Sequence, residues 1–589
     1  PMRSPQDFIH WLEQGAGARW MVRVALIVLA LLLTVVFAWK QFHGIPDEWT
    51  MQQAVLGRQL ARGQGFTTLV NYPQTYAVLK ARGVPFDEKA PYPELHQPPF
   101  YAMVLAGLFM LLPDAAWKNV PAPPGGWAPD YAILALNLML FWIAVGLTAR
   151  LAARLFDRRV AVVAAVATAV SVTLWQQTVI LSGLPLLMVL TVGLFNLLAE
   201  IELRRPDDAA GNRSIALLAG AGVVGGLLFL TEYPAGLAIP LVAAYLFWRL
   251  PVRTRSMALA AFLGAATLTA SPWLVRNIRV AGHPLALGWQ DLALKADDPT
   301  AMPSAQRDTA SVEAPSLDLS KLANKGLTGM ERNLRERVWS GGGMLLTAFF
   351  VAGLAYQFRH GAANRTRWCF AVVALVLLAA QPFFNSGESP RLPAYYLAPL
   401  IIVFGTGFFF VLVDSQAALA ANWRWAVAGL LALQALPLVR DCLEPRRIHF
   451  YFPPYYPNLF IELRRDMQTK FLPGTGVAAD VPAGTAWYGQ MRVWSKPDRL
   501  RDLYTISVDQ GIGALLLTPV TLDRPFFTEL AARKGDTIQL SDAGGWGGVY
   551  TGLVTRRMPP GFPLSAAPLR LTDNMVLLVD PNSLLHRGI

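Results

Sequence analysis

The sequence has little charge for its length. Asp, Glu, Lys and Arg make up only 15% of the 589 residues, whereas 54% are hydrophobic. A soluble chain of this size would form several domains with charged surfaces, so the balance argues against a soluble protein. No internal repeat stands out along the chain, which argues against a repeat protein, and the spacing of the two cysteines suits no metal site.

Long apolar runs are abundant. Segments 24–39, 160–175, 184–199, 216–231, 257–273 and 394–413 are nearly uncharged. Runs of about twenty residues match a hydrocarbon core of roughly 30 Å at about 1.5 Å of helix rise per residue. The chain is therefore expected to be an α-helical polytopic membrane protein. No good small-residue cleavage site follows the first run. This run is therefore expected to be an uncleaved signal anchor.

The distribution of arginine predicts the topology. The formal net charge of +12 comes mostly from short loops between runs, as the positive-inside rule requires, so it does not indicate a nucleic-acid partner. Segment 98–112 is too short for an ordinary span, and only a non-crossing segment there keeps the basic loops on one side. This predicts a bacterial inner-membrane protein with a cytoplasmic amino terminus.

The resulting topology has about eleven spans. They are expected at 21–39, 131–153, 160–180, 184–202, 214–231, 235–250, 257–274, 341–358, 367–384, 394–414 and 424–440. Cys369 and Cys442 then fall on opposite sides of the membrane, so a disulfide between them is not expected. Residues 1–440 form the transmembrane domain, with outer loops at 40–130 and 275–340.

Residues 441–589 are expected to form an outer, periplasmic α/β domain. Strands are predicted at 476–479, 513–518, 547–554 and 575–579, and helices at 486–493 and 525–534. Alternation of strands with helices is typical of an α/β fold. The predicted sheet carries no recognisable ligand motif.

Two adjacent carboxylates, Asp47 and Glu48, follow the first span. Carboxylates at a membrane interface are costly unless they are solvated, paired or functional. Asp47 could be the N-cap of an amphipathic helix at 49–61, or a general base at the mouth of a transmembrane cavity.

Further polar candidates lie on the same predicted side. His96 precedes a double proline, and Arg276 and Arg391 are basic although they lie outside. All three could bind a phosphate, but His96 could be merely solvated and the arginines could anchor lipid headgroups. Glu388 and Tyr101 are additional candidates.

These elements together resemble the GT-C superfamily of membrane glycosyltransferases, in the branch of aminoarabinose and protein O-mannosyl transferases. The resemblance rests on Pro-Asp-Glu at 46–48, Pro-Pro-Phe-Tyr at 98–101, Pro-Trp with Arg-Asn at 272–277, and Arg-Leu-Pro at 391–393. It covers about the first 400 residues, and the motifs occur in the same order and on one side of the membrane.

The resemblance implies transfer of a sugar from a polyprenyl-phosphate donor to a lipid, glycan or protein acceptor on the periplasmic face. Asp47 matches the catalytic aspartate and would act as base with inversion at the sugar carbon. His96, Arg276 and Arg391 would bind the donor phosphate. Segment 98–112 and the adjacent spans would hold the polyprenyl chain among membrane lipids.

Three departures from that pattern leave alternatives open. Residues 181–185 contain no second aspartate, so no cofactor is certain, and a divalent cation is only weakly supported. Gln97 stands where relatives carry lysine, and Glu232 stands where a basic residue is common, so it would need to pair with Arg276 or Arg391. A catalytically inactive accessory subunit is one alternative. A transporter is another, but the apolar span centres and the lack of repeats argue against it.

Overall fold

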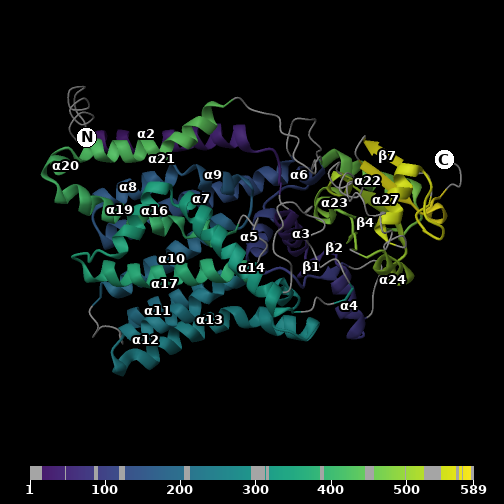
Figure 1. Cartoon of the computed structure of the whole chain (residues 1–589), viewed down its shortest axis with the longest axis horizontal. Helices are drawn as coiled ribbons and strands as arrows, with labels where there is room; N and C mark the ends of the chain where they lie inside the picture. Colours follow the sequence, from purple (N-terminus) through teal and green to yellow (C-terminus); the bar gives the residue numbers. More distant parts are fainter. Residues whose placement is uncertain are drawn as a thin grey trace, which may run out of the picture.

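The computed structural model describes residues 16–46, 48–84, 91–118, 127–204, 212–292, 312–313, 317–384, 391–444, 457–497, 499–522, 545–565, 569–572 and 575–585. Residues 16–444 contain a bundle of helices that run along the long axis of the molecule, and the C-terminal residues form a smaller domain at one end of it (Figure 1). The end of the bundle beside this domain is called the domain end below.

Within the described residues, eight helices are long and apolar enough to cross a membrane. They are α2 (Ala16–Gln41), α7 (Ala128–Leu155), α10 (Leu184–Glu202), α11 (Asn212–Thr231), α13 (Val252–Ala281), α17 (Gly361–Phe384), α19 (Ala398–Ser415) and α21 (Trp423–Leu443). This confirms a multi-pass helical membrane protein.

Two bent pairs of helices raise the number of candidate spans to ten in the described part of the chain. In the first pair, α8 (Arg158–Ala169) and α9 (Val172–Val179) meet at 50°. In the second, the stretch Leu319–Gly341 meets α16 (Met344–Leu354) at 112°. The remaining predicted span, 235–250, is a 3-10 turn followed by the 12-residue helix α12 (Ala238–Arg249). The figure of eleven spans therefore stays a prediction.

Shorter helices occupy the two loops and the breaks between spans. They are α3 (Glu48–Ala61), α4 (Pro73–Ala81), α5 (Phe100–Phe109), α6 (Asp114–Lys118), α14 (Leu319–Arg332), α15 (Val338–Gly341), α18 (Pro393–Tyr396) and α20 (Ala417–Ala421). Helix α5, which covers the apolar segment after the double proline, has 10 residues. At about 1.5 Å per residue it is too short to cross a hydrocarbon core of about 30 Å.

The C-terminal domain is built on a six-stranded sheet in the order β2-β5-β4-β6-β8-β7. Its first four strands are parallel, and β8 and β7 are antiparallel to their neighbours. The strands are β2 (Val70–Asn71), β4 (Gly476–Ala479), β5 (Val493–Ser495), β6 (Ile512–Leu517), β7 (Leu569–Thr572) and β8 (Met575–Val579); a separate pair joins β1 (Thr67–Thr68) to β3 (Tyr92–Pro93). The helices are α22 (Pro457–Lys470), α23 (Pro482–Gly489), α24 (Leu500–Gln510), α25 (Pro519–Leu522) and α27 (Trp546–Thr555).

The structure agrees with three of the strands predicted for this domain, β4, β6 and β8, and differs elsewhere. The predicted helix 486–493 begins earlier, because Pro482 occupies its first turn, and ends at Gln490, whose φ is +51°. The predicted strand 547–554 is wrong, because this segment is helix α27. Trp546, Val549 and Tyr550 recur at helical spacing and pack into the core. The predicted helix 525–534 lies outside the described residues.

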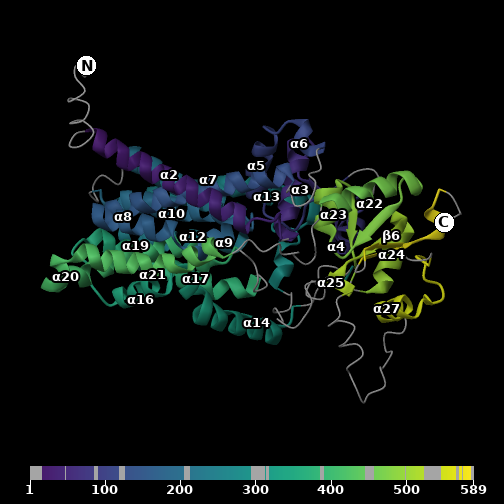
Figure 2. The same cartoon turned by 90° about the horizontal axis from the view of Figure 1, so that it is seen from above.

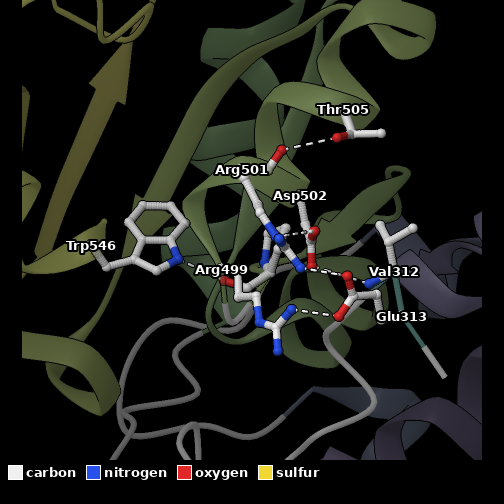
Figure 3. Close-up of polar contacts among 8 residues, drawn as sticks. Val312, Glu313, Arg499, Arg501, Asp502, Thr505 and Trp546 are labelled. Carbon is white, nitrogen blue, oxygen red and sulfur yellow. Dashed lines mark hydrogen bonds and ion pairs between the residues drawn. The ribbon is translucent and has the colours of Figure 1, made fainter. Parts of the chain in front are cut away.

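Both long loops join the C-terminal domain. Strand β2 of the first loop forms the edge of the domain's sheet by pairing with β5. In the second loop, the Glu313 carboxylate accepts from Arg499 and Arg501, and the Val312 N–H donates to Asp502 over 3.1 Å (Figure 3). The three pieces predicted to share one side of the membrane therefore lie together.

Asp480 provides a pH test of this domain. Its Oδ2 accepts from the Thr518 N–H (2.8 Å) and Oγ1 (3.2 Å), and burial raises the pKa of Asp480 to about 6. A raised pKa means that the folded state holds the proton more tightly, so this contribution to stability is present below about pH 4 and lost as the pH rises through about 6.

We expect Asp480→Asn to reduce the decline in stability between pH 4 and 7 by up to about 3 kcal/mol. Thermal unfolding of the purified protein at several pH values measures this. Asp466→Asn, which removes a carboxylate from the surface pair with Lys470, is the control for loss of one negative charge. Parallel pH curves for wild type and Asp480→Asn would contradict the assignment.

Candidate functional site

Two of the predicted site residues, Asp47 and Glu388, lie outside the described residues. Glu48 is the first residue of α3 and one of its side-chain oxygens is buried. An acidic side chain in the first turn of a helix is favoured by the helix dipole. Helix α3 therefore begins directly after Asp47 in the sequence, at the domain end of the bundle (Figure 1).

Arg391 lies against residues far away in the sequence. Its Nη1 donates to Glu232 Oε2 over 2.7 Å, and the side chains of both residues are only 6% exposed. The guanidinium also covers the Trp49 ring at 4.1 Å from the ring centroid. Of the two partners considered for Glu232, Arg276 and Arg391, the structure gives it Arg391. This buried pair places a cation beside the start of α3.

Arg276 holds a loop in place. Its guanidinium donates to the backbone carbonyl oxygens of Glu94 and Phe66 and to the Asn277 side chain, and it stacks on Trp273 at 4.7 Å. These contacts fix the chain that leads from β3 to the double proline. Arg276 therefore supports the polar segment around His96.

His96 lies in a tight turn built by Glu94. The Glu94 carboxylate accepts from the backbone N–H groups of His96 (2.7 Å) and Gln97 (3.0 Å), and burial raises the pKa of Glu94. The His96 ring packs edge-on against Tyr72 at 4.7 Å, and its Nε2 lies 3.4 Å from Thr75 Oγ1. The imidazole is thus oriented by the chain that follows β2.

Tyr101 makes contacts of a different kind. Its hydroxyl donates to the Leu181 carbonyl oxygen (2.8 Å) and contacts Asn137 Oδ1 (3.1 Å), while Asn137 donates to the Ser182 carbonyl oxygen. Leu181 has φ +65°, an uncommon conformation for a branched residue. Tyr101 and Asn137 therefore pin the strained turn between α9 and α10.

Tyr233 connects the two arginine environments. It directly follows Glu232, the partner of Arg391, and its hydroxyl accepts from Trp273 Nε1 over 2.8 Å. Trp273 in turn lies under Arg276. A Cβ on Gly288 would overlap the Tyr233 ring and touch the His96 carbonyl oxygen, so these groups lie close together. The outer polar cluster, our name for these residues, comprises Trp49, Glu94, His96, Glu232, Tyr233, Arg276 and Arg391.

An amide network extends this cluster. Gln97 Nε2 donates to Gln52 Oε1, Gln52 Nε2 donates to the Tyr72 hydroxyl, and Gln53 Nε2 donates to the Pro98 carbonyl oxygen over 3.1 Å. Trp49, Gln52, Tyr72 and Tyr233 were not predicted from the sequence. The signal available there was a group of three glutamines within 50–59, and the structure shows that all three are buried, as amides are where they find partners.

Among the described residues, no group of three or more His, Cys, Asp or Glu side chains could hold a metal ion. Both carboxylates of the cluster already have partners. Glu232 pairs with Arg391, and Glu94 accepts hydrogen bonds from two backbone N–H groups. The charged groups of the described cluster are thus held by one another or by the backbone, next to the aromatic rings of Trp49 and Trp273.

The sequence matches no protein-family model and no curated protein. The structure is similar to the oligosaccharyltransferase of Archaeoglobus fulgidus in the apo form, with a TM-score of 0.54, 13% identity, and coverage of 90% of this chain and 72% of that chain. The AglB structure from the same organism with an inhibitory peptide and a dolichol-phosphate gives a TM-score of 0.52 at 13% identity, covering 88% and 72%.

ArnT from Cupriavidus metallidurans bound to undecaprenyl phosphate is similar along almost its entire length. The TM-score is 0.52 at 13% identity, and the alignment covers 96% of this chain and 98% of that chain. Such identities establish a shared fold. The chain therefore shares the fold of these oligosaccharyltransferase and ArnT structures, which belong to the superfamily that the sequence resembles.

Proposed function

We propose that this protein transfers a sugar from a polyprenyl-phosphate-linked donor to an acceptor on the periplasmic face, with Asp47 as general base. The observation that carries the proposal is the buried Arg391–Glu232 pair over Trp49, two residues after Asp47 in the sequence. It puts an anion-binding guanidinium next to the helix that Asp47 precedes. The solved structures that share this fold include ArnT with undecaprenyl phosphate and AglB with a dolichol-phosphate.

In the proposed reaction Asp47 accepts the proton of an acceptor hydroxyl as its oxygen bonds to the anomeric carbon from the face opposite the leaving group. The bond from that carbon to the lipid phosphate breaks, and the phosphate takes the electron pair. The configuration at the sugar carbon is inverted. Cations fixed in a dry site stabilise the developing charge strongly, because the protein dipoles need not reorganise.

Arg391 is the group best placed to receive the lipid phosphate. A buried guanidinium without an anion is costly, so Glu232 compensates its charge before the donor arrives. The planar guanidinium has five N–H donors and can serve two anions at once. His96 and Arg276 would orient the same phosphate from the turn beside Tyr233.

The variant Asp47→Asn tests whether Asp47 is the general base. We expect the rate of label transfer from undecaprenyl-phosphate sugars in single-turnover assays to fall by about 10²–10⁴-fold, the usual contribution of a general base, with donor binding retained. Glu48→Gln, the neighbouring carboxylate, is the matched control and is expected to lose much less. Equal losses in both variants would argue against Asp47 as the base, and a folded wild type that binds donor without transferring sugar would favour an accessory subunit.

To test whether Arg391 binds the lipid phosphate, both members of the Arg391–Glu232 pair are replaced, not Arg391 alone. Removing one partner of a buried ion pair costs about 3–5 kcal/mol, whereas replacing both is often nearly neutral. We expect Glu232→Gln with Arg391→Met to unfold close to the wild-type temperature yet to lose binding of undecaprenyl phosphate.

Glu232→Gln alone is the control for binding. It is expected to unfold at a lower temperature than wild type, because it leaves the buried guanidinium without its anion, but to bind the lipid phosphate at least as tightly while folded. Lipid affinity is measured by ligand-induced thermal stabilisation over a titration. Wild-type affinity in the double variant would exclude Arg391 as the phosphate ligand.

A further inference from the structure

Helix α14 has its apolar residues on the wrong side for a helix packed on a protein in water. It lies within the second loop, on the outside of the bundle at the domain end (Figure 2). The buried residues of the face turned to the protein are small or polar, namely Lys325, Gly326 and, in the next turn, Asn333. Leu322 and Gly329 on the same face are half-buried, and Leu322 is the apolar side chain there. Surface helices normally turn their apolar stripe to the protein core.

This polar inner face is bound firmly to the end of α17. Lys325 Nζ donates to the Phe383 carbonyl oxygen over 3.1 Å, and Asn333 Nδ2 donates to the Leu378 carbonyl oxygen and to Gln381 Oε1, each over 3.0 Å. A Cβ on Gly326 would overlap the Phe383 ring. The rotation of α14 about its axis is therefore fixed by these contacts.

The apolar stripe consequently points away from the protein. Leu319 is 80% exposed and Leu327 is 62% exposed, with Ala323 between them and Met330 one turn further. These positions are spaced by three or four residues and share one side of a helix. The stripe continues toward exposed Leu334, Trp339, Met344 and Leu345, which lead into α16. It is thus continuous with the lipid-facing surface of the bundle.

The third side of the helix is charged and exposed. Lys321 and Arg335 have side chains 77% and 75% exposed, and they form long ion pairs with Asp318 (3.5 Å) and Glu331 (3.9 Å) on the same side. Residues 318–337 contain five Lys or Arg and three Asp or Glu, a net positive charge. A helix with an apolar side, a basic side and a tryptophan near its end has the features of one that lies in the membrane surface.

We propose that α14 lies in the plane of the bilayer at the domain end, with the Leu319–Leu327 stripe in the acyl boundary and its basic side at anionic phosphate headgroups. A spanning arrangement does not fit, because two of the three sides of α14 are polar and hydrocarbon would surround charged groups. The 112° bend before α16 is the turn from the membrane plane into the bilayer. This surface lies outside the outer polar cluster and does not depend on the proposed transferase activity.

The test uses adjacent positions that point in different directions. In a background with Cys369→Ala and Cys442→Ser, single cysteines are introduced by Leu327→Cys and, as the matched control, Thr328→Cys. Both positions are exposed. Each is labelled with bimane in the full chain, which is reconstituted in phosphatidylcholine/phosphatidylglycerol nanodiscs containing doxyl lipids.

We expect doxyl lipids to quench the label at position 327 about threefold more than at 328, because an interfacial helix buries its apolar face by about 5–10 Å. Replacing phosphatidylglycerol by phosphatidylcholine is expected to weaken quenching at 327. Equal quenching at both positions, or none at either, overturns the proposal. So does shielding of 327 in lipid-free amphipol together with a disulfide between two copies at that position, which would assign the stripe to a second copy of this chain.

Discussion

The architecture depends on one buried guanidinium, that of Arg58 in the middle of α3. It is fully buried and donates to the backbone carbonyl oxygens of Ala486 and Trp487, each over 2.7 Å, near the C-terminal end of α23. Burial, with Arg62 and Arg464 nearby, lowers the pKa of Arg58. The last carbonyl groups of a helix have no hydrogen-bond partner within it and carry partial negative charge. A cation at this end supplies hydrogen-bond donors and balances that charge.

A second contact completes this docking from the bundle. Asp130, in the first turn of α7, accepts from Trp487 Nε1 and from the Tyr488 hydroxyl, each over 2.9 Å. Helix α23 is thereby held by α3 on one side and by α7 on the other. Helix α3 also carries Trp49 and Gln52. The same helix therefore contacts both the C-terminal domain and the outer polar cluster. The C-terminal domain is thus joined to the bundle by the buried charged groups Arg58 and Asp130 as well as by apolar contacts.

In the outer polar cluster every buried charged side chain has a partner. Arg391 and Glu232 neutralise one another, Glu94 is held by backbone donors, and Arg276 is held by backbone acceptors. Each buried ion has a partner, as the low local dielectric requires.

The sequence by itself determined the membrane class, the short segment at 98–112 and the GT-C resemblance, because apolar runs, arginine bias and ordered motifs are local properties. It also located β4, β6 and β8. The sequence left two partners for Glu232, and the tertiary structure decided for Arg391. Tertiary structure alone decided that β2 joins the C-terminal sheet and that Arg58 and Asp130 hold α23. These partners are separated by long stretches of chain, and local spacing does not show which distant groups will meet. The misassigned strand at 547–554 has a different origin, because the helical spacing of Trp546, Val549 and Tyr550 is a local pattern that the prediction misread.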